Sequence, residues 1–141
     1  MDTSLNFMLS PKKTKFKKMH RGRLKGKAST NIKLHYGDFG LQTLEASWIS
    51  SKQIEAIRRT ISRYTKRVGK LWIKIFPDKP ITARAAESRM GSGKGSVSYW
   101  VACVKPGNIL LELADISAPL AIEALKLAQY KLSVKSKIIL K

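Results

Sequence analysis

The sequence predicts an α+β fold in which a mainly antiparallel sheet carries two packed helices. Short strand-like segments alternate with turn signals, and only two segments show the period of an amphipathic helix, so the regular strand–helix alternation of a parallel sheet is missing. In addition, 141 residues with 43% hydrophobic residues are enough for one domain with a substantial core. A basic N-terminal extension and a long glycine-rich loop are expected to project from this domain.

The N-terminal extension is distinguished by its charge. Between residues 11 and 27 the chain has nine cations, no acid and only three large apolar side chains. Such a segment buries too little surface to offset the entropy lost on ordering, so we expect an extended arm that becomes ordered on a partner. We assign residues 1–30 to this arm and residues 31–141 to the single α+β domain.

The first half of the domain is expected to contain strands followed by a helix. Apolar side chains recur among glycines between residues 32 and 49, which indicates one or two interrupted strands. Ser50 and Gln53 then have the spacing of a capping box, and Gly69 stands where a helix would end, so we predict a helix over residues 51–68. Its buried stripe is expected to consist of Ile54, Ile57, Ile61, Tyr64 and Val68.

The second half is expected to alternate strands with one further helix. Residues 70–76 alternate in hydrophobicity and predict a strand that Pro77 ends. Residues 78–98 hold few large apolar side chains and are expected to form the long projecting loop. The remaining elements are a hairpin of strands 99–104 and 109–113 joined by a Pro-Gly turn, a helix capped by Ser117 that runs from Pro119 to about Lys131, and a last strand over residues 135–140.

The composition favours a polyanion as the partner. Twenty-eight Lys and Arg residues against nine Asp and Glu residues give a net charge of +19, which exceeds what solubility requires and opposes compaction by self-repulsion. Nucleic acid is the first candidate and an anionic membrane surface the second. No apolar stretch reaches the length of a membrane span, and residues 1–7 resemble neither a secretory signal nor a transit peptide.

Catalytic, metal and cofactor sites are not indicated by the sequence. One Cys and two His residues cannot supply the usual tetrahedral zinc site, and Cys103 is expected to be a buried, unreactive thiol in a strand. The acids are scattered without a pair spaced for general acid–base catalysis. The segment around Lys94 lacks the dinucleotide-binding pattern and also the P-loop pattern, since Ser88 and Gly95 stand where a P-loop needs Gly and Ser or Thr. We therefore expect neither an enzyme nor a metal or cofactor site.

Two basic surfaces, the arm and the polar face of the first helix, are expected to bind RNA phosphates. On the helix, Arg63 repels both Arg59 and Arg67 at a spacing of four residues, and such a face persists if a polyanion covers it. RNA is favoured over DNA because no helix-turn-helix or zinc finger is visible and a flexible arm suits an irregular surface. The alternatives are a merely solvated arm or a localisation signal for the first surface, and an ordinary solvated face for the helix. The residues concerned are Lys12, Lys13, Lys15, Lys17, Lys18, Arg21, Arg23, Arg58, Arg59, Arg63, Lys66 and Arg67.

The glycine-rich segment over residues 89–96 is the third candidate site. Three glycines at alternate positions allow positive φ angles and close backbone approach, while Arg89 and Lys94 add charge, as a phosphate-binding loop requires. A flexible turn without function is the alternative. The aromatic residues that either stack on bases or fill the core are Trp48, Trp72, Tyr99 and Trp100.

Two long blocks of the sequence resemble the signature blocks of the large-subunit ribosomal protein L-sixteen family. They are residues 66–77 (KRVGKLWIKIFP) and residues 89–95 (RMGSGKG), the second followed by Tyr99-Trp100. The opening block over residues 8–16 is similar as well, so the resemblance covers nearly the whole chain, from Met8 to about Ile138.

This resemblance implies a structural constituent of the large ribosomal subunit. Such a protein binds large-subunit ribosomal RNA near the peptidyl-transferase centre and contacts A-site tRNA, with P-site tRNA as a secondary expectation. The arm and the helix face would lie on ribosomal RNA beside neighbouring ribosomal proteins, without a small-molecule substrate or cofactor. The loop expected near tRNA contains Arg84, Arg89, Met90, Gly91, Ser92, Gly93, Lys94 and Gly95. An independent nucleic-acid-binding regulatory protein is the alternative function.

The amino-acid sequences of several segments favour a plastid member of the family. Residues 41–45, 48–55 and 85–89 look more like cyanobacterial and plastid members than like proteobacterial ones. This resemblance predicts a place in the ribosome of the plastid (chloroplast) stroma, with the bacterial cytoplasm or the mitochondrial matrix as alternatives. Residues 1–7 precede the family's usual start and are either an added extension or an upstream start. Arg89 matches an arginine that is hydroxylated in some bacterial members.

Overall fold

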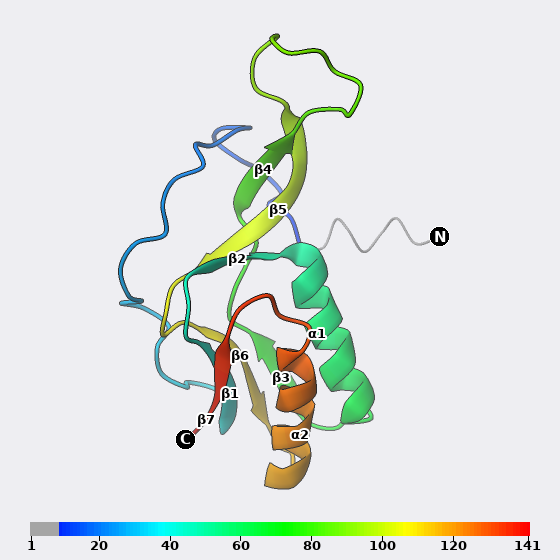
Figure 1. Ribbon diagram of the computed structural model, residues 1–141. Coiled ribbons are helices and arrows are strands. Elements are labelled where there is room, and N and C mark those ends of the chain that lie inside the picture. The colour runs from blue at the N-terminus through cyan, green and yellow to red at the C-terminus, as the bar shows by residue number, and fades with distance from the viewer. Residues whose placement is uncertain (1–8) are drawn as a thin grey trace.

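The computed structural model describes residues 9–141, which form two antiparallel sheets and two helices, so the predicted α+β class is confirmed (Figure 1). The strands divide between two sheets, one with the order β3-β6-β1-β7 and one with the order β2-β5-β4. In chain order the elements are β1 (Phe39–Thr43), β2 (Ser47–Ser50), α1 (Ser51–Tyr64), β3 (Lys70–Ile73), β4 (Lys79–Ala83), β5 (Ser96–Val104), β6 (Ile109–Ala114), α2 (Ala118–Gln129) and β7 (Ser136–Leu140).

Helix α1 begins where the capping box predicts and ends earlier than expected. The side chain of Ser50 accepts a hydrogen bond from the backbone N–H of Gln53, whose side chain accepts one from the backbone N–H of Ser50. The helix stops at Tyr64 because Lys66 and Arg67 take φ angles of 51° and 66°, which a right-handed helix cannot continue. Of the predicted stripe, the three isoleucines are therefore buried, whereas the tyrosine and the valine that follow are exposed.

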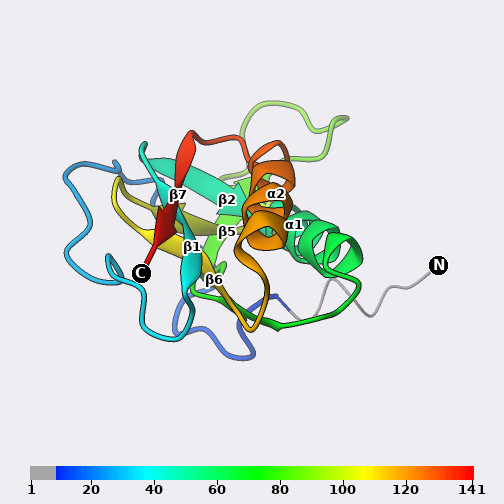
Figure 2. The same cartoon turned by 90° about the horizontal axis from the view of Figure 1, so that it is seen from below.

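The core lies between the two helices and the sheets. Figure 2 shows α1 and α2 next to each other on one side of the sheets, and α2 also contacts β1 and β7. The buried alanines Ala121, Ala124 and Ala128 allow α2 to lie close to these elements, and every residue of β6 is buried. The three buried isoleucines of α1 contribute about 1.5–3 kcal/mol each before entropy. This packing leaves the arginine-rich face of α1 directed outward. Among the described residues, neither helix is long and apolar enough to cross a membrane.

The projecting loop is shorter than the predicted range 78–98. Strand β4 pairs antiparallel with β5, which begins at Ser96, so the loop comprises residues 84–95 at the end of a two-stranded hairpin. Strand β4 has few large apolar side chains and contains Pro80 and Thr82. Backbone pairing with β5, and not an apolar pattern, holds it in place. A pattern of hydrophobicity therefore misses this strand.

The predicted hairpin of residues 99–104 and 109–113 is wrong. Strand β5 pairs with β2 and β4, whereas β6 pairs with β1 and β3. The expected tight turn does join them, with the backbone N–H of Asn108 donating to the carbonyl of Lys105 at 3.1 Å. Distant segments bind this turn from the side, because Gly107 donates to the carbonyl of Thr43 at 2.8 Å and Ala28 donates to that of Pro106 at 3.0 Å. The turn therefore connects strands that belong to different sheets.

Glu112, in β6, is a fully buried carboxylate that the sequence analysis did not identify. Its Oε2 accepts hydrogen bonds from the backbone N–H groups of His35, Tyr36 and Gly37 at 3.1, 2.6 and 2.9 Å, and Lys74 Nζ lies 3.7 Å from its Oε1. Burial by itself raises the pKa of Glu112, but the three N–H donors and the charge of Lys74 outweigh burial and lower the pKa below its ordinary value. The carboxylate therefore fastens the chain just before β1 to a central strand.

Candidate RNA-binding surfaces

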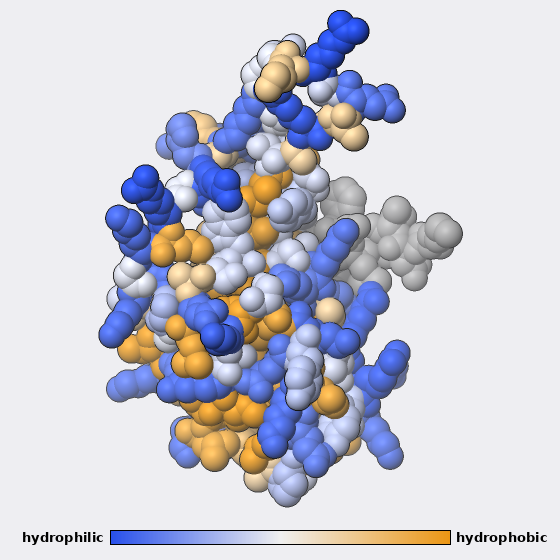
Figure 3. Space-filling view, in the orientation of Figure 1, coloured by the Kyte–Doolittle hydropathy of each residue, from blue (hydrophilic) through white to orange (hydrophobic). Residues whose placement is uncertain are grey.

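The basic arm is exposed and follows the surface of the domain. Residues 9–38 contain neither helix nor strand, and every arm cation predicted to bind RNA is exposed. Figure 1 shows the arm passing from the N-terminal end of α1 across the β4–β5 hairpin and then down the side of the molecule to β1. In Figure 3, hydrophilic side chains predominate on the upper part of this face and along its lower right margin, and apolar side chains gather at its middle and lower left.

Three lysine side chains connect the arm to the hairpin. Lys18 Nζ donates to the carbonyl of Lys94 at 2.8 Å, and Lys94 Nζ donates to the carbonyl of Met19. Lys79 Nζ donates to the carbonyl of Arg21. The structure thus brings together arm and loop residues that the sequence analysis placed at separate sites. It also adds Lys79, which no pattern in the sequence pointed to.

Trp48 lies under this crossing of the arm. Arg21 and Lys79 stand over its indole ring at 5.7 and 4.7 Å from the centroid, distances at which a cation is attracted to the ring face. Trp48 therefore supports the arm, a role that the sequence analysis did not consider. Trp72 likewise contacts the segment before β1, since its ring stacks on that of exposed Tyr36 with a centroid distance of 5.8 Å.

The basic face of α1 is only partly neutralised. Arg58 and Arg59 share the carboxylate of Glu55 at 2.5 and 2.9 Å, and the hydrogen bonds from Arg58 lower the pKa of Glu55 although burial raises it. Within residues 9–141 no carboxylate pairs with Arg63, Lys66 or Arg67. Lys66 and Arg67 lie in the turn after α1. These two and the three arginines of the helix, the five cations predicted here to bind RNA, line one hollow of about 620 Å³. The hollow is lined by Arg58, Arg59, Ser62, Arg63, Lys66 and Arg67.

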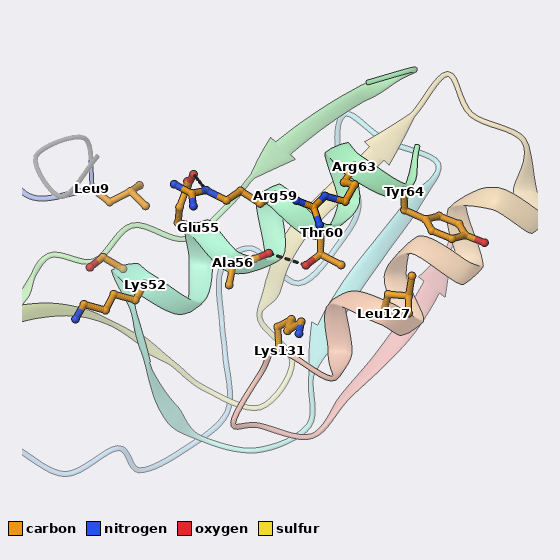
Figure 4. A pocket seen from close by; sticks show the side chains of 11 residues that line it. Leu9, Lys52, Glu55, Ala56, Arg59, Thr60, Arg63, Tyr64, Leu127 and Lys131 are labelled. Atoms are coloured by element: carbon orange, nitrogen blue, oxygen red, sulfur yellow. Dashed lines mark hydrogen bonds and ion pairs between the residues drawn. The ribbon is translucent and has the colours of Figure 1, made fainter. Parts of the chain in front are cut away.

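A second groove runs between α1 and α2 and has a volume of about 730 Å³ (Figure 4). Arg59 and Arg63 belong to both hollows, and Lys131, just after α2, adds a cation that the sequence analysis missed. Tyr64 donates its hydroxyl to Glu123 of α2, and this hydrogen bond raises the pKa of Tyr64. The basic surface around α1 is thus wider than its helical periodicity indicated.

The predicted loop residues lie together at the far end of the hairpin. Gly91 and Gly93 have φ angles of 105° and 79°, as the expected left-handed backbone requires. Arg84 donates to the carbonyl of Gly93 at 2.7 Å across the base of the loop, and Met90 is 99% exposed. The loop is therefore held at its base and fully accessible at its tip.

Gly95 is needed for close backbone packing, and its replacement by alanine is expected to destabilise the protein. A Cβ atom there would lie 2.4 Å from the carbonyl oxygen of Ala83, so the base of the loop must shift. We expect a loss of about 1–3 kcal/mol, the usual cost of overpacking, measured as a lower thermal unfolding midpoint. Ser96→Ala, at the exposed next residue, is the control. Equal midpoints for the two variants would contradict this role of Gly95.

The described residues show little that is suited to catalysis. Within residues 9–141 no three His, Cys, Asp or Glu side chains gather in a way that could hold a metal ion. Cys103 is exposed, contrary to expectation, because its position in β5 faces outward. Partial desolvation nevertheless raises the pKa of its thiol, which disfavours the reactive thiolate.

Comparison with known proteins points in one direction. Residues 11–139 match the family described as ribosomal protein L16p/L10e. The chain is 64% identical over 132 residues to the large ribosomal subunit protein uL16c of Trieres chinensis, covering 94% of this chain and 96% of that protein. It is 61% identical over 134 residues to the proteins of the same name from Gracilaria tenuistipitata and Phaeodactylum tricornutum, with 95% of this chain and 99% and 97% of those proteins covered.

Proposed function

The chain belongs to the ribosomal protein L16p/L10e family, and from this premise we propose that its basic surfaces bind large-subunit ribosomal RNA near the peptidyl-transferase centre. As a family member it is a structural constituent of the large ribosomal subunit and not an enzyme, which confirms the expectations drawn from the sequence. Its partners are accordingly the ribosomal RNA and the neighbouring ribosomal proteins of that subunit.

The observation that carries the RNA proposal is that, within residues 9–141, most cations on the arm and on the basic face of α1 have no carboxylate partner. Within the described part of the chain, no ion pair involves the arm cations or the cations at the end of α1. Each uncompensated charge raises the self-repulsion of a protein whose net charge is +19, and phosphates would remove this cost. We treat residues 1–30 as the arm and residues 31–141 as the domain, although residues 1–8 lie outside the described residues.

The loop over residues 84–95 is proposed to contact tRNA. The loop projects away from the body at the end of the β4–β5 hairpin (Figure 1). Arg89, one of its residues, is exposed. A basic tip supported by a hairpin can reach a molecule that binds and leaves while the rest of the domain stays on ribosomal RNA. A-site tRNA is the proposed partner, with P-site tRNA second.

The plastid stroma is the proposed location. The relatives from Trieres chinensis, Gracilaria tenuistipitata and Phaeodactylum tricornutum share the name uL16c, which denotes the chloroplast protein. This agrees with the plastid-like segments of the sequence. The bacterial cytoplasm and the mitochondrial matrix have no comparable support among these relatives.

Sedimentation tests the proposed function. A tagged copy of the chain, expressed in the chloroplast of a transformable alga, is expected to migrate with large ribosomal subunits in sucrose gradients at physiological salt. Protein that stays at the top of the gradient, and that binds duplex DNA as tightly as ribosomal RNA, would instead support an independent nucleic-acid-binding regulatory protein.

Replacing Arg89 with alanine is expected to weaken tRNA binding and leave incorporation into the subunit nearly unchanged. A charge-assisted hydrogen bond from a guanidinium to phosphate is worth about 1.5–3 kcal/mol, so A-site tRNA should bind about tenfold more weakly or worse. Filter binding of tRNA to purified ribosomes measures this effect. Glu87→Gln, which removes an acid from the same loop, should not weaken binding. Normal tRNA binding together with poor incorporation of the Arg89 variant would reverse the assignment of the loop.

A further inference from the structure

Four cations from distant parts of the chain meet where the arm crosses the hairpin. We call them the arm–hairpin cluster, and its members are Lys18, Arg21, Lys79 and Lys94. Lys18 and Lys94 each donate to a backbone carbonyl on the other segment, and Lys79 donates to the carbonyl of Arg21. The arm is thus attached to the hairpin at two points, near the loop and near the start of β4.

No carboxylate within residues 9–141 forms an ion pair with a member of this cluster. The ion pairs found among residues 9–141 involve other cations, and the hydrogen-bond acceptors inside the cluster are neutral carbonyl oxygens. Arg21 and Lys79 stand over the same ring of Trp48, and Lys18 and Lys94 donate to carbonyls at the same crossing, so like charges repel within each pair at moderate salt. The arm is therefore seated on the hairpin against an electrostatic cost that an anion would remove.

The cluster also has unused hydrogen-bond donors. An ammonium group has three N–H donors, and each lysine of the cluster uses one of them for a backbone carbonyl. Arg21 lies over the ring of Trp48, which leaves the edge of its guanidinium group for further hydrogen bonds. Lys18, Arg21 and Lys94 are exposed, and Lys79 is half-buried. Phosphate oxygens are suitable acceptors for all four side chains.

We propose that the arm–hairpin cluster is one composite site for the phosphate backbone of a ribosomal RNA strand, and that RNA bound there fixes the position of the loop over residues 84–95. The proposal rests on the proposed function and refines it. A strand that contacts Lys18 and Arg21 on one side and Lys79 and Lys94 on the other joins the arm to the hairpin. The loop that projects toward tRNA is then positioned by RNA as well as by protein.

The glycine-rich loop needs a partner to restrain its backbone conformation. Within the loop, Gly91 and Gly93 have left-handed backbones, and an alanine Cβ at either position would meet nothing within 4 Å. Open glycine-rich segments keep much of their conformational freedom unless a partner restrains them. The arm crosses at Lys94, next to these glycines, so RNA that binds the arm restrains the loop directly.

The first test measures the salt dependence of binding. Three full-length proteins are titrated with protein-free large-subunit ribosomal RNA at several salt concentrations: wild type, Lys79→Gln and Lys94→Gln. Each variant should lower the magnitude of the slope of log K against log salt by about one, and the double variant by about two. Lys135→Gln is the matched control, because Glu45 already pairs with Lys135 at 3.3 Å and its slope should hardly change.

The outcomes separate this proposal from the proposed function. If wild type prefers ribosomal RNA but the Lys79 and Lys94 variants keep the slope of the Lys135 control, the cluster is not an RNA site. An acidic segment of a neighbouring protein would then be the occupant to consider. If wild type itself binds an unrelated RNA of equal length as tightly, the proposed function fails.

The second test follows the loop inside the assembled subunit. Met90→Cys in a Cys103→Ser background carries a single iron–EDTA probe at the tip of the loop, where Met90 is 99% exposed. Hydroxyl radicals from this probe should cleave a narrow set of nucleotides in wild-type subunits. Adding Lys79→Gln should spread the cleavage over more nucleotides, and adding Lys135→Gln should not. An unchanged pattern with Lys79→Gln would overturn the positioning role of the cluster.

Discussion

A variant in which Lys12, Lys13, Lys15, Lys17 and Lys18 are all replaced by glutamine is expected to be largely absent from large ribosomal subunits. All five side chains are exposed, and within residues 9–141 none has a carboxylate partner. Each lost phosphate contact lowers the salt slope by about 0.7–0.9, so the affinity for ribosomal RNA should fall on the order of 10³-fold near physiological salt. Sucrose gradients and salt titrations with large-subunit ribosomal RNA measure the two effects.

The C-terminal part of the chain supplies a matched control for this variant. Five exposed lysines there can be replaced by glutamine to give the same net charge. These residues are Lys105, Lys126, Lys135, Lys137 and Lys141. We expect this control to keep most of its affinity, because it retains the arm. Equal losses in both variants would mean that total charge governs binding and that the arm is not a distinct site.

Replacing Glu112 with alanine is expected to have the largest effect on stability. The change leaves the backbone N–H groups of residues 35–37 without their acceptor and Lys74 without its nearest carboxylate. Breaking a buried charged pair typically costs about 3–5 kcal/mol, and unpaired buried N–H groups add to this cost. The thermal midpoint should therefore fall by about 10 °C or more.

Hydrogen exchange distinguishes this local anchor from a general packing defect. The amides of His35, Tyr36 and Gly37 should lose protection in Glu112→Ala more than those of α1, since only the former donate to the carboxylate. Glu45→Gln breaks a solvent-exposed pair with Lys135 and should cost less than about 1 kcal/mol. A Glu112 variant as stable as this control would refute the anchoring role.

The pKa of Glu112 also sets the direction of a pH effect. Because the pKa is lowered in the folded state, the folded protein binds fewer protons than the unfolded protein around that pKa, and stability rises with pH there. The contribution of the ionised group is fully present above the ordinary carboxyl pKa and disappears as the pH falls through the lowered value. The stability difference between wild type and Glu112→Gln should therefore shrink on acidification below that ordinary pKa, as measured by urea unfolding at several pH values.

Local signals predicted the elements that local contacts form. The capping box at Ser50 and Gln53 placed the start of α1 correctly, because its hydrogen bonds join residues three apart in the chain. The end of α1 was missed, since Lys66 and Arg67 take left-handed backbones that their residue types do not favour. Strand β4 was missed because pairing with β5, and not an apolar pattern, holds it.

Contacts between residues far apart in the sequence could not be predicted from sequence patterns. Nothing in the sequence marks Glu112 as buried, because its partners are backbone groups 75 to 77 residues away. The same holds for Lys79 and Lys94, whose acceptors in the arm are 58 and 75 residues away. Periodicity reports only which face of an element is apolar, and it cannot tell which distant segment will cover that face.

Composition, local hydrogen bonding and long matching blocks were enough to predict the α+β class, the main helices, the excess of positive charge and the resemblance to a ribosomal protein family. The division of the strands between two sheets became clear only from the folded structure, as did the position of the arm on the hairpin beside the glycine-rich loop. The reason is that almost any residue can take part in backbone pairing, and a lysine can donate to the carbonyl of almost any residue. Which of these contacts form depends on the packing of the whole chain.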